Sequence, residues 1–189
     1  MSTQRGPEQI ETERLRIRKA RPEDLMDIWQ NVWMDGSISQ SMLWQPTLTE
    51  EEARKRMQRT ILYQAQVPAY FVCERETDQA IGFCGVLEKE PGVYEDAGLC
   101  IAAAWQNRGL GKEMVRGLCH LVFDIFRGEK FVYGCFSDNL RSAAVCRACG
   151  FHYVTSHEGV RPYDGYHYVV NEYELSREEY ERGKEESLF

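Results

Sequence analysis

The chain has 189 residues, a formal net charge of −7 and a hydrophobic share of 43%. This length suits one domain, and that share of hydrophobic residues supports a substantial core, which argues against disorder. No apolar run approaches the roughly 18 residues of a membrane span, and the polar start lacks the apolar centre of a secretion signal. The acidic balance disfavours a nucleic-acid partner. We therefore expect a cytoplasmic protein without a membrane or nucleic-acid partner.

The seven cysteines lie mostly inside apolar stretches. Cys146 and Cys149 form a CxxC pair, but no second Cys or His pair stands at the spacing of a zinc site. We interpret the cysteines as small buried hydrophobic residues in a reducing compartment, and we expect no metal.

Hydrophobic periodicity and turn signals divide the chain into strands and helices. Period-two alternation and β-rich composition predict strands over residues 14–18, 69–73, 80–87, 94–101, 130–136, 151–155 and 166–175. Apolar residues at three- and four-residue spacing, with start and stop signals, predict helices over residues 22–33, 49–64, 109–126 and 139–149. Thr49 and Glu52 have the spacing of a capping box for the second helix.

The order β-α-α-β-β-β-α-β-α-β-β favours one sheet covered by helices. We predict an α/β (α+β) domain over residues 12–175, with a single mixed, mostly antiparallel twisted sheet of about seven strands and helices on both faces. Residues 1–11 are expected to form a loose leader, and residues 176–189 a charged, helix-prone and solvated tail.

One segment points to phosphate chemistry: Trp105-Gln106-Asn107-Arg108-Gly109-Leu110-Gly111-Lys112, where a predicted strand ends and the strongest helix begins. Its glycines let the backbone approach a ligand, and the unpaired N–H groups of the first helical turn favour phosphate oxygens. The glycines alone fit an ordinary strand-to-helix turn equally well. A P-loop or a dinucleotide fingerprint would need other residues at three positions, where this chain has Gln106, Glu113 and Met114.

Gln106-x-x-Gly109-x-Gly111 resembles the acyl-CoA pyrophosphate loop of the GCN5-related N-acetyltransferase (GNAT) superfamily. Further segments resemble, in order, the branch that includes ribosomal-protein N-terminal acetyltransferases: Thr12-Glu13-Arg14-Leu15-x-Ile17-Arg18, Asp96-Ala97-Gly98, and Asn139-x-x-Ser142 closing with Gly150-Phe151. The element order agrees too, so the resemblance covers about residues 11–175. It implies the GNAT fold and acetyl transfer from acetyl-CoA to a primary amine.

The resemblance also implies where acetyl-CoA lies, namely in a splay between the predicted strands 94–101 and 130–136. The pantetheine arm would pair with the first of these strands, and the pyrophosphate would rest on the loop amides. The implied cofactor-binding residues are Leu99, Cys100, Ile101, Gln106, Asn107, Arg108, Gly109, Leu110, Gly111, Lys112 and Asn139.

Acetyl transfer to an amine requires a base for the alkylammonium, donors for the oxyanion and a proton donor for the leaving thiolate. Asp96 is our candidate base, acting through water, because it occupies the family's acidic position and shares a predicted strand face with Cys100. A carboxylate paired with an arginine, or simply solvated, is the alternative reading of this position.

The proton donor is left open by a departure from the family pattern. Helical spacing places Asn139, Ser142 and Cys146 on one face, and many family members carry Tyr where this chain has Cys146. Ser142 and Cys146 are therefore our candidates. A serine bonded to its own helix and a spectator thiol are the competing interpretations.

The acceptor is expected between the loops 36–46 and 159–165, with Trp44, Tyr163 and Tyr166 as candidate lining residues. A peptide or protein N-terminus calls for an open groove there, and a small-molecule amine for a closed, acid-lined pocket. We interpret the chain as an N-acetyltransferase that acts by direct transfer, as a monomer or homodimer. The alternative is a catalytically silent acyl-CoA-binding sensor, which the missing tyrosine favours.

Overall fold

Nine strands form one sheet in the computed structural model, which describes residues 5–186. Their bounds are β1 Gln9–Glu11, β2 Leu15–Arg18, β3 Ala69–Glu74, β4 Ala80–Glu90, β5 Val93–Asp96, β6 Cys100–Ile101, β7 Lys130–Phe136, β8 His152–Val160 and β9 His167–Ser176. Eight run in the order β1-β2-β3-β4-β5-β7-β9-β8, while β6 pairs with β4. Only the β5–β7 pair is parallel within this part of the chain. The predicted mixed, mostly antiparallel sheet is confirmed, with more strands than expected.

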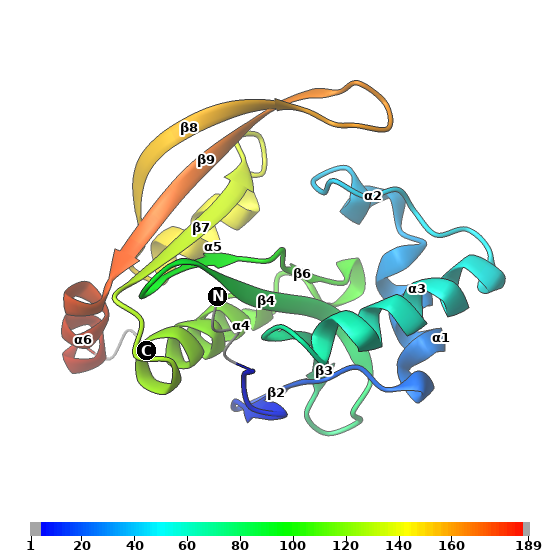
Figure 1. The fold of residues 1–189 in the computed structure, drawn as a ribbon, viewed down its shortest axis with the longest axis horizontal. Coiled ribbons are helices and arrows are strands. Elements are labelled where there is room, and N and C mark those ends of the chain that lie inside the picture. Colours follow the sequence, from blue (N-terminus) through cyan, green and yellow to red (C-terminus); the bar gives the residue numbers. More distant parts are fainter. Residues whose placement is uncertain (1–4, 187–189) are drawn as a thin grey trace.

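The helical segments pack against the sheet as Figure 1 shows. They are η1 Pro22–Asp24, α1 Leu25–Ile28, η2 Trp29–Trp33, α2 Gly36–Ser39, α3 Glu50–Gln64, η3 Ala103–Trp105, α4 Leu110–Cys119, η4 His120–Ile125, α5 Leu140–Ala148 and α6 Arg177–Glu185. The first predicted helix consists of three short segments, and α2 lies in the expected loop 36–46. The Thr49–Glu52 capping box at the start of α3 is confirmed.

Two apolar clusters show that helices cover both faces of the sheet. Tyr70 and Val72 of β3 belong to the cluster that contains Leu118 of α4, whereas Phe71 belongs to the cluster that contains Ile28 of α1. Because successive residues of a strand point to opposite faces, these clusters lie on opposite sides of the sheet. This arrangement agrees with the predicted fold class.

The sheet opens between β5 and β7. These strands pair from Val93 to Glu95, and no backbone register continues beyond that point. The strand predicted over residues 94–101 is wrong in its middle, because Gly98 has a φ of +87° and the chain leaves the sheet before β6. The cause is local: the N–H of Gly98 donates to Oδ1 of Asp96 at 3.0 Å, as in an Asx turn. The regular alternation that placed Asp96 and Cys100 on one strand face is therefore lost.

The two ends of the chain take part in the fold more than predicted. Residues 9–11, expected in a loose leader, form β1 and pair with β2. Within the expected solvated tail, Tyr180 of α6 is buried, and its ring stacks on Phe123 with centroids 4.7 Å apart. Residues 1–4 and 187–189 lie outside the described part of the chain, and the domain limits at 12 and 175 stay predictions.

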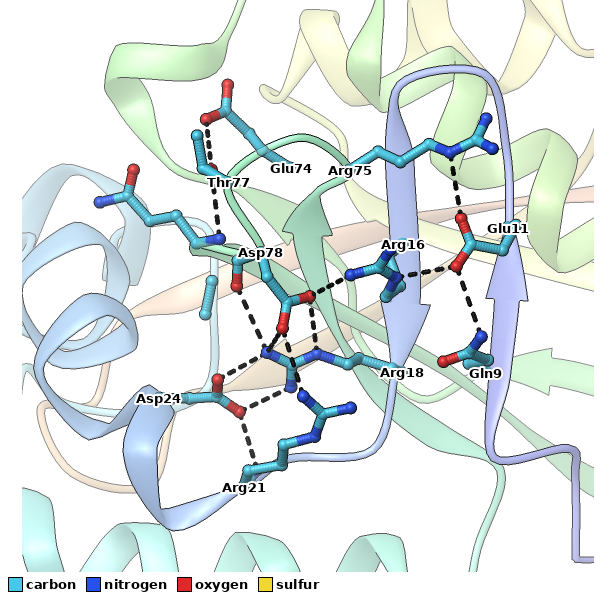
Figure 2. A network of polar contacts seen from close by, with 12 residues as sticks. Gln9, Glu11, Arg16, Arg18, Arg21, Asp24, Glu74, Arg75, Thr77 and Asp78 are labelled. Atoms are coloured by element: carbon cyan, nitrogen blue, oxygen red, sulfur yellow. Dashed lines mark hydrogen bonds and ion pairs between the residues drawn. The ribbon is translucent and has the colours of Figure 1, made fainter.

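A network of charged side chains joins β2 to η1 and to the β3–β4 turn (Figure 2). The buried Arg18 donates to both oxygens of Asp24, at 2.8 and 2.7 Å. Arg16 and Arg21 bond to Asp78, which also accepts from Arg18. None of these residues lines the cavities described below, and the network connects three elements of the fold. In residues 5–186 no helix is long and apolar enough to cross a membrane.

Candidate active site

The loop before α4 presents a row of backbone N–H groups at the helix start. Asn107 and Gly109 have φ values of +61° and +80°, which turn the chain sharply into the helix. The carbonyl of Gly109 accepts the N–H of Glu113 at 3.1 Å, so the amides of residues 110–112 precede the first helical hydrogen bond. Among the described residues, no group accepts a hydrogen bond from these three amides. Together with the helix dipole, they can hold the oxygens of a phosphate.

Gln106 connects this loop to β6 and to α5 through hydrogen bonds of its side chain. Its Nε2 donates to the carbonyl of Ile101 at 2.9 Å, and its Oε1 accepts from Arg141 of α5 at 3.0 Å. The side chain therefore positions the loop between β6 and α5. The side chain of Leu110 is buried in the core, and the carbonyl of Arg108 accepts from Arg14 at 2.8 Å.

A first cavity of about 490 Å³, called here the loop cavity, lies between this loop, β6 and α5. Most of the predicted cofactor-binding residues line it, namely Leu99, Cys100, Ile101, Gln106, Asn107, Gly109, Gly111, Lys112 and Asn139. Arg108 and Leu110 do not. Tyr133 of β7 and Ser142 and Val145 of α5 also line this cavity.

A second cavity of about 430 Å³, called here the aromatic cavity, is also lined by Leu99. Its aromatic walls are Trp44, Phe83, Phe136 and Tyr168. Glu95, Asp96 and Glu172 add three carboxylates, and the lining residues include no lysine or arginine. Ser41, Met42, Leu99, Asn139 and Ser142 line both cavities, so the two cavities meet at these residues.

Two of the three carboxylates have a basic side chain as partner. Glu95 is 3.0 Å from Nζ of Lys89, and Glu172 is 3.4 Å from Nδ1 of His157. His157 also lines the aromatic cavity, whereas Lys89 does not. The walls therefore present a net negative charge to a ligand.

Asp96 bridges the opening between β5 and β7. Its Oδ2 accepts the N–H of Gly134 on β7 at 2.7 Å, and its Oδ1 accepts the N–H of Gly98. Burial raises the pKa of Asp96 to about 6, although these two hydrogen bonds favour the charged form. The wall thus carries a carboxylate that takes up a proton close to neutral pH.

Ser142 lies where the two cavities meet, one turn into α5. Its N–H donates to Oδ1 of Asn139 at 3.1 Å, so Asn139 caps the helix. Its Oγ lies 2.8 Å from Oη of Tyr133 on β7. Cys146 lines neither cavity, and burial raises the pKa of its thiol to about 12. The structure therefore brings Ser142, and not Cys146, to the aromatic cavity that Asp96 also lines.

The two loops predicted to flank the acceptor are joined by Arg161. This residue is buried, and its Nη1 donates to the carbonyls of Gln40 and Met42 at 3.0 and 3.4 Å. Its Nη2 bonds to Asp164 at 2.6 Å. Figure 1 shows the β8–β9 hairpin arching towards α2, which these hydrogen bonds connect. We call this set of contacts the Arg161 clamp.

The three predicted acceptor residues lie in different places around the clamp. Trp44 lines the aromatic cavity, and the guanidinium of Arg56 lies 4.3 Å from the centroid of its ring. Tyr163 lines neither cavity, and its Oη donates to the carbonyl of Trp44 at 3.3 Å. Tyr166 lines a neighbouring cavity next to Arg161 and Asp138, outside the aromatic cavity. The structure therefore brings only Trp44 to the aromatic cavity.

Sequence reasoning missed Tyr133, Arg161 and Glu172. The alternation over residues 130–136 signals that Tyr133 shares a face with Phe131 and Cys135, but not that its hydroxyl faces α5. Nothing in the sequence links Arg161 to Gln40. Across residues 5–186 no group of three or more His, Cys, Asp or Glu is placed to hold a metal ion.

Comparisons with known proteins agree with this arrangement. Residues 14–152 match the sequence model of the acetyltransferase (GNAT) domain. No curated protein matches the sequence. The fold is similar to that of a GNAT-family acetyltransferase from Bacillus anthracis, with 18% identity, a TM-score of 0.77 and coverage of 90% of this chain and 99% of that one.

Two further solved structures have the same fold. RimL, a ribosomal alpha-N-protein acetyltransferase, has 22% identity and a TM-score of 0.75, with coverage of 89% of this chain and 94% of that one. The microcin self-immunity acetyltransferase MccE, solved with acetyl-CoA and AMP, has 16% identity and a TM-score of 0.77, with coverage of 91% and 98%.

Proposed function

This chain belongs to the GNAT acetyltransferase family, and from that premise we propose that it moves an acetyl group from acetyl-CoA directly to a small cationic primary amine. One observation carries the proposal: two cavities of opposite character meet at Leu99 and Ser142. One cavity offers backbone amides for phosphate, and the other offers carboxylates and aromatic rings for an amine.

The loop cavity fits acetyl-CoA by the chemistry of its walls. The amides of residues 107–112 would hold the pyrophosphate, and Lys112 adds positive charge beside them. The edge of β6 not paired with β4 would accept the pantetheine arm as an added strand. Acetyl-CoA supplies the activated acyl group, and the protein supplies the position of the thioester at the junction.

Three groups at the junction or on the adjoining wall of the aromatic cavity meet the demands of acyl transfer. Asp96 would take the proton of the ammonium through water, and its pKa of about 6 keeps it ionised at neutral pH. The N–H of Leu99, which has no acceptor among the described residues, is our candidate donor to the oxyanion. Ser142 would donate to the sulfur as the C–S bond breaks.

The walls of the aromatic cavity favour a small amine over a peptide. The Arg161 clamp joins the two loops across the groove that a peptide would need. The three wall carboxylates suit an acceptor with one or more positive charges, and the rings suit its methylene groups. RimL is named for action on a protein N-terminus, and that activity is the competing acceptor in the test below.

The test is release of CoA thiol from acetyl-CoA with a panel of diamines, monoamines, amino acids and short peptides with free N-termini. We expect turnover with the small cationic amines. Turnover confined to peptides would overturn the acceptor class. Tight CoA binding without turnover on any amine would instead support the silent sensor, whose main basis is Cys146 at the family's tyrosine position.

A variant of the loop tests the cofactor position. Gly111→Leu should weaken CoA binding at least about tenfold, because the new side chain would fill the loop cavity. Gly111 has no positive φ, and an added Cβ would meet only Val145, at 3.6 Å. Ala148→Leu on an exposed part of α5 is the matched control. Normal CoA binding by Gly111→Leu would contradict the placement.

A further inference from the structure

A buried pair of hydroxyl groups forms part of the wall where the two cavities meet. Oη of Tyr133 and Oγ of Ser142 are 2.8 Å apart, and the tyrosine residue is 1% exposed. Both residues line the loop cavity, and Ser142 lines the aromatic cavity as well. A buried phenol nearly always has a hydrogen-bond partner, and in the described chain that partner is Ser142.

The chemistry of the two groups decides which one donates. A phenol is a stronger acid than an aliphatic alcohol, so the favoured arrangement has the tyrosine O–H donating to Oγ of the serine. Burial and the nearby charge of Asp96 raise the pKa of Tyr133 well above its usual value. The tyrosine therefore keeps its proton and stays a donor throughout the working pH range.

This direction determines where the proton of Ser142 can point. Because Oγ accepts from Tyr133, the serine O–H must point away from the tyrosine. The thiol of Cys135 is a neighbour of Ser142, but a neutral sulfur is a weak acceptor. A developing thiolate in the loop cavity would be a charged acceptor, and charge-assisted hydrogen bonds are about twice as strong as neutral ones.

We propose that Tyr133 is a positioning residue that aims the hydroxyl of Ser142 at the leaving sulfur of acetyl-CoA. The inference rests on the proposed function. As the intermediate collapses, the C–S bond breaks with its electron pair on sulfur, and Ser142 donates a hydrogen bond to it. The nitrogen loses its second proton as the amide forms, which balances the proton that the thiolate finally takes up. Tyr133 neither gains nor loses a proton in this step.

A double-mutant cycle tests this role. Ser142→Ala should lower kcat about a hundredfold and Tyr133→Phe about tenfold, with little change in KM for acetyl-CoA. If the tyrosine acts through the serine, Tyr133→Phe costs nothing further in the Ser142→Ala background. Independent losses that multiply in the double variant would overturn the proposal.

A second measurement does not depend on turnover. The pKa of the CoA thiol bound to the protein is measured from the ultraviolet absorbance of the thiolate. The absorbance of the protein alone is subtracted at each pH. Tyr133→Phe and Ser142→Ala should both raise that pKa, since each removes stabilisation of the thiolate. An unchanged pKa in Tyr133→Phe would overturn the proposal even if no acceptor had been found. Turnover that is normal in Tyr133→Phe would overturn it while leaving the proposed function intact.

Tyr70→Phe is the matched control. Its hydroxyl is also buried, and it has no hydrogen-bond partner among the residues described. Tyr70 lies on β3 and lines neither cavity. This variant should keep both kcat and the pKa of bound CoA, and its melting temperature shows what loss of a buried phenolic hydroxyl does to the fold alone.

Discussion

Asp96 connects the architecture of the sheet to the proposed chemistry. Its carboxylate accepts from Gly98 on its own strand segment and from Gly134 across the opening. The same two hydrogen bonds that hold the opened strands also orient the carboxylate at the wall of the aromatic cavity. A residue that both shapes a site and titrates near neutral pH is a strong candidate for a general base.

Replacement of this carboxylate should change both the rate and its pH dependence. With an acceptor whose pKa is near 10.4, wild-type kcat/KM should rise up to about pH 6 and then level off, because ionised Asp96 takes the proton from the ammonium. Asp96→Asn should lower kcat/KM about 10²- to 10⁴-fold. Its residual rate should keep rising with pH as free amine accumulates. If kcat/KM of Asp96→Asn levelled off above pH 6 as in wild type, Asp96 would be ruled out as the base.

The stabilities of wild type and Asp96→Asn give an independent check on the pKa of Asp96. The pKa of Asp96 in the folded state lies above the value of about 3.9 in an unfolded chain, so its contribution to stability is complete below pH 4 and is lost as pH rises through 6. Relative to wild type, Asp96→Asn should therefore gain about 2 kcal/mol in free energy of unfolding between pH 4 and 7. Denaturant melts of both proteins at the two pH values measure it.

At the scale of elements, the sequence predicts best what local signals control. The capping box of α3 and the limits of β7 appear as predicted because each depends on residues close together in the chain. The break after β5 was missed, since period-two alternation does not reveal that a side chain will bond to the N–H two residues later. β1 and the packing of α6 against Phe123 were not predicted, because charged segments gave little sign of partners elsewhere in the chain.

The candidate site divides in the same way. The glycines and position of the loop before α4 predict its free amides, and the resemblance predicts most residues of the loop cavity. The acceptor side was harder, because Arg161 bonds to a carbonyl 121 positions away and only Trp44 of the three named aromatic residues reaches the aromatic cavity. Tyr133 was overlooked because a tyrosine on a core-facing strand position is usually a packing residue.

The Arg161 clamp gives a prediction about how two elements move together. Arg161→Ala removes the bonds to Gln40 and Met42, so the segment around α2 should separate from the β8–β9 loop. We expect KM for the acceptor to rise about tenfold, and discrimination against peptides to fall, with CoA affinity unchanged. Hydrogen exchange over residues 36–46 and 159–166 should become faster.

Arg177→Ala is the matched control for that variant. Arg177 also donates to backbone carbonyls, those of Phe123 and Gly128, but it is the first residue of α6 and lines neither cavity. Its loss should reduce stability without changing KM for the acceptor. If both variants affect KM alike, a general loss of stability and not the clamp explains the effect.

At the scale of the whole molecule, the two proposed substrates carry opposite charges and enter different cavities. The chain has a net charge of −7, and the aromatic cavity is lined by three carboxylates. A cationic acceptor would therefore be attracted by both the overall field and the local walls. Acetyl-CoA is an anion, and in the proposed placement it would bind through the loop amides and Lys112 against that field.

The negative charge around the acceptor cavity predicts how kcat/KM for the acceptor depends on salt concentration. At saturating acetyl-CoA, kcat/KM for a diamine should fall about tenfold between about 0.1 and 1 M salt, as the Debye length shrinks from about 10 to 3 Å. An amino acid with no net charge should show little change. Absence of any difference between the two acceptors would contradict a cationic substrate class.

Two matched glutamate variants separate the cavity from the overall charge. Glu172→Gln changes a wall carboxylate, whereas Glu174→Gln removes the same charge two residues along β9, outside both cavities and paired with Lys130. Local attraction predicts that only Glu172→Gln weakens the salt dependence with the diamine. Equal effects of the two variants would mean that the net charge of the molecule, and not its acceptor cavity, attracts the amine.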